Sequence, residues 1–211
     1  MKRGLFITVE GTDGSGKTTQ IRLMEEYLRE KGYDIVFTRE PGGTRIGEKI
    51  RSLILDPKNT EMGFIAEMLL YASSRAQHVA ELVKPAVLLG KVVICDRFVD
   101  SSYVYQGFGR GIELKTVEFV NNVALDGMIP DITFFFDISP EIALKRRIDS
   151  TGADRIENEK MEFHMKVYEG YKKLVSIYPE RIKSIDSNRD VESIFEDVRK
   201  VLDKLIDSSE I

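Results

Sequence analysis

Short apolar segments alternate along this chain with longer segments whose apolar residues recur at helical spacing. Five of the short segments are predicted to be strands: 5–10, 34–38, 92–96, 132–138 and 181–185. Apolar strands that alternate with helices are typical of a parallel sheet covered on both faces. The pattern therefore predicts an α/β fold with three layers, in which a five-stranded parallel sheet carries helices on both faces.

Two of the predicted helices have clear patterns. The first spans residues 17–31, with Ile21, Met24 and Leu28 on one face and Gly32 as its stop. The last helix is predicted from one apolar stripe made of Val191, Ile194, Phe195, Val198, Val201, Leu202, Leu205 and Ile206.

Functional residues are expected directly after the strands, because ligands of open parallel sheets bind at the carboxyl ends of the strands. The segments at these positions are 11–18, 39–45, 96–106, 139–157 and 186–189.

The composition fits a single domain spanning residues 1–211. A hydrophobic content of 42% supplies a core, and the net charge of -4 argues against nucleic acid or anionic lipid as a partner. No apolar stretch approaches the roughly 20 residues of a membrane span. The single cysteine, Cys95, excludes an intramolecular disulfide and is expected in the core, which fits a reducing cytoplasm.

The segment after the first strand carries the most specific motif. It matches G-x-x-x-x-G-K-[ST] at every constrained position, in the order Gly11, Thr12, Asp13, Gly14, Ser15, Gly16, Lys17, Thr18. Such a loop surrounds phosphate oxygens with backbone N–H groups, and the next helix directs its positive end at them. Lys17 can reach the β- and γ-phosphates, and the Thr18 hydroxyl can bind Mg²⁺. The motif predicts a P-loop that binds a nucleotide, rather than a glycine-rich turn without a ligand.

A second anion site is predicted beside the P-loop. Arg39 follows the second strand and Arg97 follows the third, and arginine binds phosphate in a bidentate manner. Either arginine alone could instead be a surface residue or an ion-pair partner. Asp96 ends the third strand, where an acidic residue can order Mg²⁺ or its water, although it could also cap the next helix.

Several segments together resemble bacterial thymidylate kinases. They are the P-loop with an acidic third residue, T-R-E-P-G-G-T at 38–44, D-R-F-x-D-S-S-x-x-Y-Q-G at 96–107, L-Y-A-S-S-R at 70–75 and D-R-I-E at 154–157. The resemblance extends from about residue 5 to 205 and implies a P-loop kinase fold, a homodimer, and ATP and dTMP as substrates.

The resemblance also implies the acceptor site. Asp13 would contact the 3′-OH side of the deoxyribose, and Arg39 and Arg97 would hold the acceptor phosphate, with Arg51 nearby. The other residues would surround the base and sugar: Tyr71 against the thymine ring, Arg75, Gln106 and Ser101 or Ser102 near its edge, and Tyr105 against the 2′ position. Spacing alone favours a core aromatic at Tyr71, because it lies in an apolar helical segment.

Residues 146–157 are implied to form a lid. Arg146 would pack on the adenine of ATP, and either Arg147 or Arg155 would close over the transferred phosphate, because positions 12–15 contain no arginine. The alternative is an exposed charged loop, in which Arg155 pairs with a glutamate two or four residues further on. The catalytic residues expected overall are Lys17, Asp13, Arg97, Arg147 and Arg155.

The expected reaction transfers the γ-phosphate of ATP to dTMP and gives dTDP and ADP. A deoxynucleoside kinase is the alternative enzyme, but the additional arginines fit an acceptor that already carries a phosphate. A P-loop switch protein is the alternative outside enzymes, yet the N-K-x-D run typical of guanine-binding switches does not occur. The apolar helical segment 64–71 could pack against a second subunit.

Overall fold

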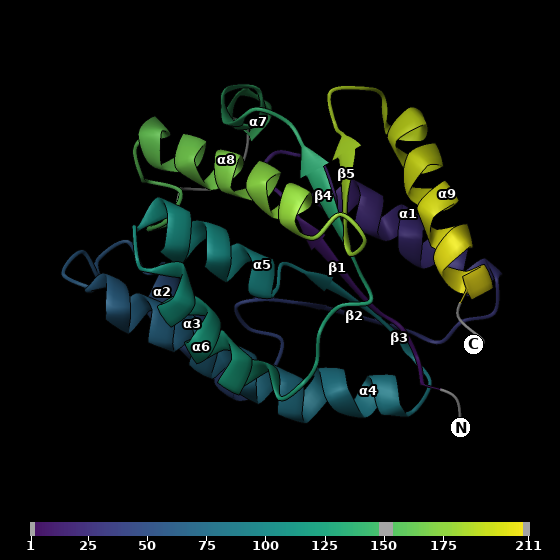
Figure 1. The fold of residues 1–211 in the computed structure, drawn as a ribbon, viewed down its shortest axis with the longest axis horizontal. Helices are drawn as coiled ribbons and strands as arrows, with labels where there is room; N and C mark the ends of the chain where they lie inside the picture. Colours follow the sequence, from purple (N-terminus) through teal and green to yellow (C-terminus); the bar gives the residue numbers. More distant parts are fainter. Residues whose placement is uncertain (1–2, 148–153, 209–211) are drawn as a thin grey trace.

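The five predicted strands form one parallel sheet with the order β2-β3-β1-β4-β5. In this computed structural model, which describes residues 3–147 and 154–208 with the side chain of residue 147 left out, the strands lie at the centre of the molecule (Figure 1). Their bounds are β1 Phe6–Glu10, β2 Ile35–Arg39, β3 Val92–Asp96, β4 Ile132–Asp137 and β5 Ile182–Asp186. The predicted α/β fold with a five-stranded parallel sheet is confirmed.

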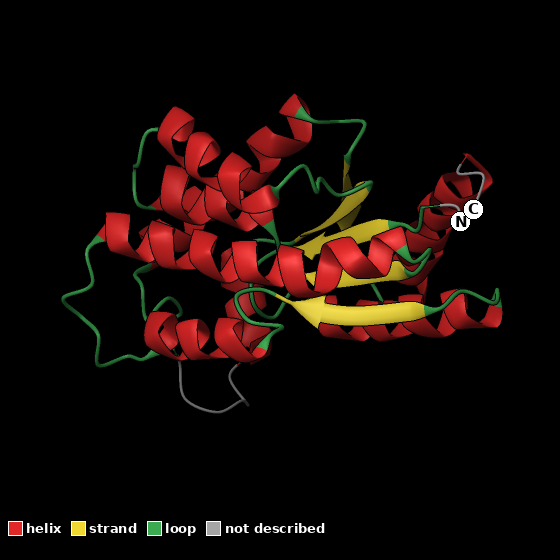
Figure 2. Cartoon of the chain, turned by 90° about the horizontal axis from the view of Figure 1, so that it is seen from below, coloured by secondary structure: helices red, strands yellow, loops and turns green. Residues whose placement is uncertain are grey.

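Helices flank the sheet on both faces (Figure 2). They are α1 Lys17–Glu30, α2 Arg45–Leu55, α3 Phe64–His78, α4 Lys84–Leu88, α5 Val99–Ser102, α6 Leu114–Leu125, α7 Pro140–Arg147, α8 Met161–Ile177 and α9 Val191–Ser208. Two π-helical segments, Val79–Val83 and Tyr103–Gly109, extend α3 and α5. No helix in the described part of the chain is long and apolar enough to cross a membrane.

Successive residues of each strand point into different hydrophobic clusters. Phe134 and Phe136 of β4 pack into the cluster formed with α1 and α9, whereas Phe135 between them packs against α8. On the α1 side the predicted residues Ile21, Met24 and Leu28 are all buried. This alternation follows from the two-residue period of a strand, so apolar residues on both faces require a layer of helices on each side.

Element boundaries differ from the predicted ones by about one residue. The β2 strand begins at Ile35 instead of Asp34, whose carboxylate forms an ion pair with Lys91 outside the sheet. The first helix ends at Glu30, and Gly32 follows with φ of 90°, a left-handed conformation that suits glycine. Cys95 is buried within β3, as expected for a core residue, and burial raises the pKa of its thiol.

The strand register brings the motif-bearing segments together. Arg39 at the end of β2 lies opposite Asp96 of β3, and Asp96 lies opposite Val9 of β1. The P-loop, the segment after Arg39 and the segment after Asp96 therefore leave the same edge of the sheet side by side.

Candidate active site

The P-loop connects β1 to α1 and requires glycine at specific positions. Gly14 has φ of 85°, and a Cβ added there would lie 2.1 Å from the carbonyl oxygen of Ala143 in α7. Any other side chain at position 14 would therefore push α7 away from the loop. Gly16 adopts φ of 89° directly before α1, so the backbone can turn sharply into the helix.

Lys17 holds its ammonium inside this loop. Its Nζ donates to the carbonyl oxygens of Gly11 at 3.1 Å and Thr12 at 2.9 Å, and lies 3.6 Å from Asp13 Oδ1. The side chain is 6% exposed, and burial together with the nearby charge of Arg97 lowers its pKa. The loop thus keeps one largely desolvated cation where phosphate oxygens are expected.

The residues around the P-loop fit a magnesium ion. Among the described residues, Thr12 Oγ1, Ser15 Oγ and Asp96 Oδ1 are buried side-chain oxygens without a hydrogen-bond partner. Thr18 lies exposed in the first turn of α1. The described part of the chain has no group of three acidic, histidine or cysteine side chains that could hold a metal by itself. Mg²⁺ in phosphotransferases needs only one or two protein ligands beside phosphates and water, so Thr18 and Asp96 suffice.

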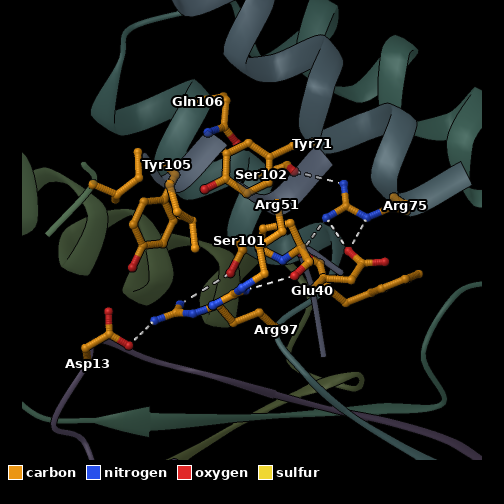
Figure 3. Close-up of a pocket in the computed structure, with 14 residues that line it drawn as sticks. Asp13, Glu40, Arg51, Tyr71, Arg75, Arg97, Ser101, Ser102, Tyr105 and Gln106 are labelled. Atoms are coloured by element: carbon orange, nitrogen blue, oxygen red, sulfur yellow. Dashed lines mark hydrogen bonds and ion pairs between the residues drawn. The ribbon is translucent and has the colours of Figure 1, made fainter. Parts of the chain in front are cut away.

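An open cavity adjoins the P-loop, and we call it the acceptor cavity (Figure 3). Eight of the nine predicted acceptor residues line it: Asp13, Arg51, Tyr71, Arg75, Arg97, Ser101, Tyr105 and Gln106. The ninth, Arg39, is absent from the lining; its guanidinium is half exposed and lies 3.1 Å from Glu48. The side chains come from the P-loop and from segments after β2 and β3, so the sheet topology assembles the cavity.

Arg97 joins the P-loop to the acceptor cavity. Its Nη2 donates to Asp13 Oδ1 at 2.9 Å, and its guanidinium lies over the ring of Tyr105, 5.4 Å from the ring centre. The backbone of Arg97 adopts φ of 67°, a left-handed conformation that is uncommon outside glycine. The surrounding contacts therefore fix both the backbone and the guanidinium of Arg97.

Arg75 is engaged by protein groups from all sides. Its Nε donates to Glu40 Oε2 at 2.8 Å and its Nη2 to the carbonyl oxygen of Phe98 at 2.9 Å, while Nη1 donates to Ser102 Oγ and Asn121 Oδ1. Arg75 is 1% exposed and still lines the acceptor cavity. These four hydrogen bonds thus hold the charge of Arg75 in place beside the cavity.

Two tyrosines form apolar walls of the acceptor cavity. Tyr71, which from its spacing could also have been a core residue, is only partly buried and lines the cavity from α3. Burial raises the pKa of Tyr105 to about 12, so its hydroxyl stays protonated at neutral pH. Both rings are therefore uncharged surfaces suited to a base or a sugar.

The two segments that flank residues 148–153 are each attached to the rest of the protein by an arginine. At the end of α7, Arg146 Nη1 donates to the carbonyl oxygen of Ser187 at 3.0 Å, which places it beside the loop after β5. Arg155 Nη2 lies 2.7 Å from Glu67 Oε2, and its Nε donates to the carbonyl oxygen of Ile54 at 2.8 Å. The partner of Arg155 is thus a distant glutamate of α3. The central part of the predicted lid and the side chain of Arg147 lie outside the described residues.

A buried carboxylate that the sequence patterns did not predict lies beneath the site. Glu10 of β1 accepts hydrogen bonds from the backbone N–H groups of Phe98 and Ser101, from Ser101 Oγ at 2.6 Å and from the Tyr171 hydroxyl at 2.7 Å. Burial, and next the charge of Asp100, raise the pKa of Glu10 to about 7. A glutamate that ends an otherwise apolar strand was the available signal.

Two further buried groups were also missed. Glu40 accepts from Arg75 and lies 2.9 Å from His78 Nδ1, so it anchors Arg75 between β2 and α3. Its place inside the T-R-E-P segment was the signal. Glu67 gave no signal in the sequence, because its partners follow it by many residues and only the packing brings them close.

The fold and the site define a P-loop phosphotransferase that holds a second anionic substrate beside its donor loop. The family model for thymidylate kinase matches residues 9–198, and the chain belongs to the thymidylate kinase family.

Similar proteins cover nearly the whole chain. The thymidylate kinase of Caldanaerobacter subterraneus subsp. tengcongensis is 51% identical over 99% of this chain and 100% of its own length. The thymidylate kinase of Clostridium novyi is 49% identical over 96% and 100%. The crystal structure of thymidylate kinase from Ehrlichia chaffeensis superposes with a TM-score of 0.78 at 36% identity, covering 95% of this chain and 99% of that one. Neither the deoxynucleoside kinase nor the switch protein is favoured by these relatives.

The raised pKa of Glu10 predicts a pH dependence of stability. Because the folded-state pKa of about 7 lies above the ordinary value of 4.5, the folded protein binds this proton more tightly than the unfolded chain. The contribution of Glu10 to the free energy of unfolding should therefore fall between about pH 4.5 and 7, by about 3 kcal/mol. Glu10→Gln, which resembles the protonated acid, should lose this fall. Chemical denaturation from pH 4.5 to 8 measures the free energy of unfolding of each protein, with a substitution of the exposed Glu196, Glu196→Gln, as control. An equal dependence of this free energy on pH in wild type and Glu10→Gln would contradict the prediction.

Proposed function

We propose that this chain transfers the γ-phosphate of ATP to dTMP and so forms dTDP and ADP. As a member of the thymidylate kinase family it is an ATP-dependent nucleoside monophosphate kinase. The observation that carries the proposal is the junction of two sites, since Asp13 belongs to the P-loop and also lines the acceptor cavity. Two phosphate-bearing substrates can therefore meet at one point.

The donor phosphates would lie in the P-loop. Backbone N–H groups and the N-terminus of α1 would hold their oxygens, and Lys17 would leave its loop carbonyls to neutralise charge on the β- and γ-phosphates. Thr18 and Asp96 would hold Mg²⁺, which supplies charge neutralisation between the phosphates when bound. Arg146 would pack on adenine near the loop after β5. Phosphoryl transfer depends mostly on such positioning and electrostatic stabilisation.

The acceptor would occupy the cavity with its phosphate toward Arg97 and its base toward α3. Arg97 is half-buried, is held by Asp13 of the P-loop and lines the cavity. Arg51, held by the carbonyl oxygen of Pro41 at 2.8 Å, and the more exposed Arg39 would add charge from α2 and β2. Tyr71 would cover the base, and Tyr105 the sugar, with Ser101 close by.

Base selection would come from polar groups at the cavity wall. Arg75 presents positive charge toward the O4 side of thymine, where cytosine carries an amino group. A hydrophobic pocket discriminates one methyl group only by about 1–3 kcal/mol. Uracil, which lacks only the methyl group of thymine, should therefore be excluded less strictly than cytosine.

A homodimer is proposed from one exposed apolar surface. The side chains of α3 and α6 that contribute to it are Phe64, Ile65, Leu69, Phe119 and Val123, each about half exposed or more. The two helices pack beside each other, so these exposed apolar residues lie on neighbouring helices. Apolar aromatic and aliphatic side chains of this kind are enriched in the centres of subunit interfaces.

The function is tested by an assay of ADP formation with ATP and a panel of nucleoside monophosphates. We expect dTMP to be the best acceptor, dUMP to be weaker and dCMP to be poorest, with thymidine itself inactive. Lys17→Ala is the matched inactive control and should reduce kcat by about 10²–10³, because it removes a preorganised charge from the transition state. Faster turnover of thymidine than of dTMP would refute the proposal.

Arg97 and Arg147 should affect the kinetics differently. If Arg97 holds the acceptor phosphate in the ground state, Arg97→Ala should raise KM for dTMP and lower kcat, with KM for ATP nearly unchanged.

If Arg147 contacts the transferred phosphate only in the transition state, Arg147→Ala should lower kcat and kcat/KM equally by about 10³. Arg155 is already bound to Glu67, so Arg147 is the better candidate for this role. Initial rates at varied ATP and dTMP concentrations measure kcat and both KM values for each variant. A loss confined to ATP binding in Arg97→Ala would contradict the placement of Arg97 on the acceptor phosphate.

The dimer proposal predicts a change of mass. Phe119 is 72% exposed in α6, so Phe119→Asp should leave the fold intact but place a charge in the proposed interface. Sedimentation velocity should then show wild type as a dimer and the variant as a monomer at micromolar concentration. The control Lys204→Asp, exposed on α9, which packs against α1 and β5, should remain dimeric. A monomeric wild-type protein would disprove the proposal.

A further inference from the structure

Glu67 of α3 is a fully buried carboxylate beside the acceptor cavity. It accepts a hydrogen bond from Gln106 Nε2 at 2.9 Å, and two from Arg110, whose Nε and Nη2 lie at 3.2 and 3.0 Å. Arg155 Nη2 lies 2.7 Å from the same carboxylate. Glu67 therefore joins α3 to the π-helical segment after α5 and to the chain that follows residue 153.

This carboxylate is ionised at neutral pH. Burial by itself would raise the pKa of Glu67, but hydrogen bonds from Arg110 and Gln106 and the charge of Arg110 outweigh burial and hold that pKa below its ordinary value. An ionised carboxylate has acceptors only. Gln106 must consequently turn its NH₂ group toward Glu67, because the opposite amide orientation would place two acceptors against each other.

The fixed amide has a consequence inside the acceptor cavity. With Nε2 committed to Glu67, Gln106 keeps its carbonyl Oε1 for the cavity, which it lines together with Tyr71 (Figure 3). No donor to Oε1 is present among the described residues. Thymine and uracil carry an N3–H donor, whereas neutral cytosine carries an acceptor at N3. A carbonyl oxygen at this wall therefore favours thymine and uracil.

We infer that Glu67 is a specificity-determining positioning residue, which sets the amide of Gln106 so that its carbonyl faces the N3 edge of the base. The inference rests on the proposed placement of the base against Gln106. Glu67 contacts no substrate in this arrangement; it acts through Gln106 alone. In the described part of the chain, the hydrogen bond that Gln106 Nε2 donates goes to Glu67.

The test replaces the carboxylate with its neutral isostere. In Glu67→Gln the side chain can donate as well as accept, so the amide of Gln106 can turn either way. We expect the ratio of kcat/KM for dTMP to that for dCMP to fall by about tenfold. The control Arg110→Lys removes the two guanidinium bonds to Glu67 but leaves the bond to Gln106, and its ratio should stay within about twofold of wild type. Thermal unfolding of both variants confirms that they are folded.

A double-mutant cycle separates this inference from the proposed base contact. Gln106→Leu should lower the same ratio, and Glu67→Gln should add nothing further in the Gln106→Leu background. If Gln106→Leu lowers the ratio but Glu67→Gln does not, the role of Glu67 is refuted while the base contact stands. If Gln106→Leu leaves the ratio unchanged, the base contact fails, and the inference fails with it.

A measurement on the wild-type protein covers the case in which Glu67→Gln does not fold. The side-chain NH₂ resonances of Gln106, identified in ¹⁵N spectra by their loss in Gln106→Leu, should exchange with solvent much more slowly than those of Gln77, whose amide donates to Glu81 in an exposed hydrogen bond. Rapid exchange of the Gln106 amide would overturn the inference.

Discussion

The parallel pairing of β1 with β3 is the constraint on which the site depends. It places the P-loop, which leaves β1, beside the segment that begins with Asp96 and Arg97. Pairing of β3 with β2 adds the segment that begins with Arg39. Because the carboxyl ends of parallel strands meet at one edge, a donor loop and an acceptor cavity arise next to each other without any further device.

Carboxylates hold most of the cations at this edge. Arg97 is fixed by Asp13, Arg75 by Glu40, and Arg155 by Glu67. Breaking a buried pair of this kind leaves an uncompensated charge, so such pairs define side-chain positions more than they add stability. A chain with a net charge of -4 can in this way present a local anion site of defined geometry.

The carboxylates also link the site to the rest of the fold. Glu10 receives hydrogen bonds from the start of α5 and from α8, and Glu67 receives them from the segment after α5 and from the chain after residue 153. The walls of the acceptor cavity are therefore attached to two buried acidic groups. Preorganised walls are what phosphoryl transfer requires, since its rate depends on the placement of charges before the reaction begins.

The sequence by itself determined the strands, the P-loop and the cations at the strand ends, because each is encoded locally by apolar periodicity, by glycine spacing or by position after a strand. Resemblance to a family added Tyr71, Tyr105 and Gln106, and of these Tyr71 would by its spacing have been taken for a core aromatic. Only the tertiary structure decided that Arg155 pairs with Glu67 and that Glu10 lies buried beneath Arg97. The physical reason is that the partner of a buried charge, and the cost of its burial, depend on how distant elements pack, which no local pattern records.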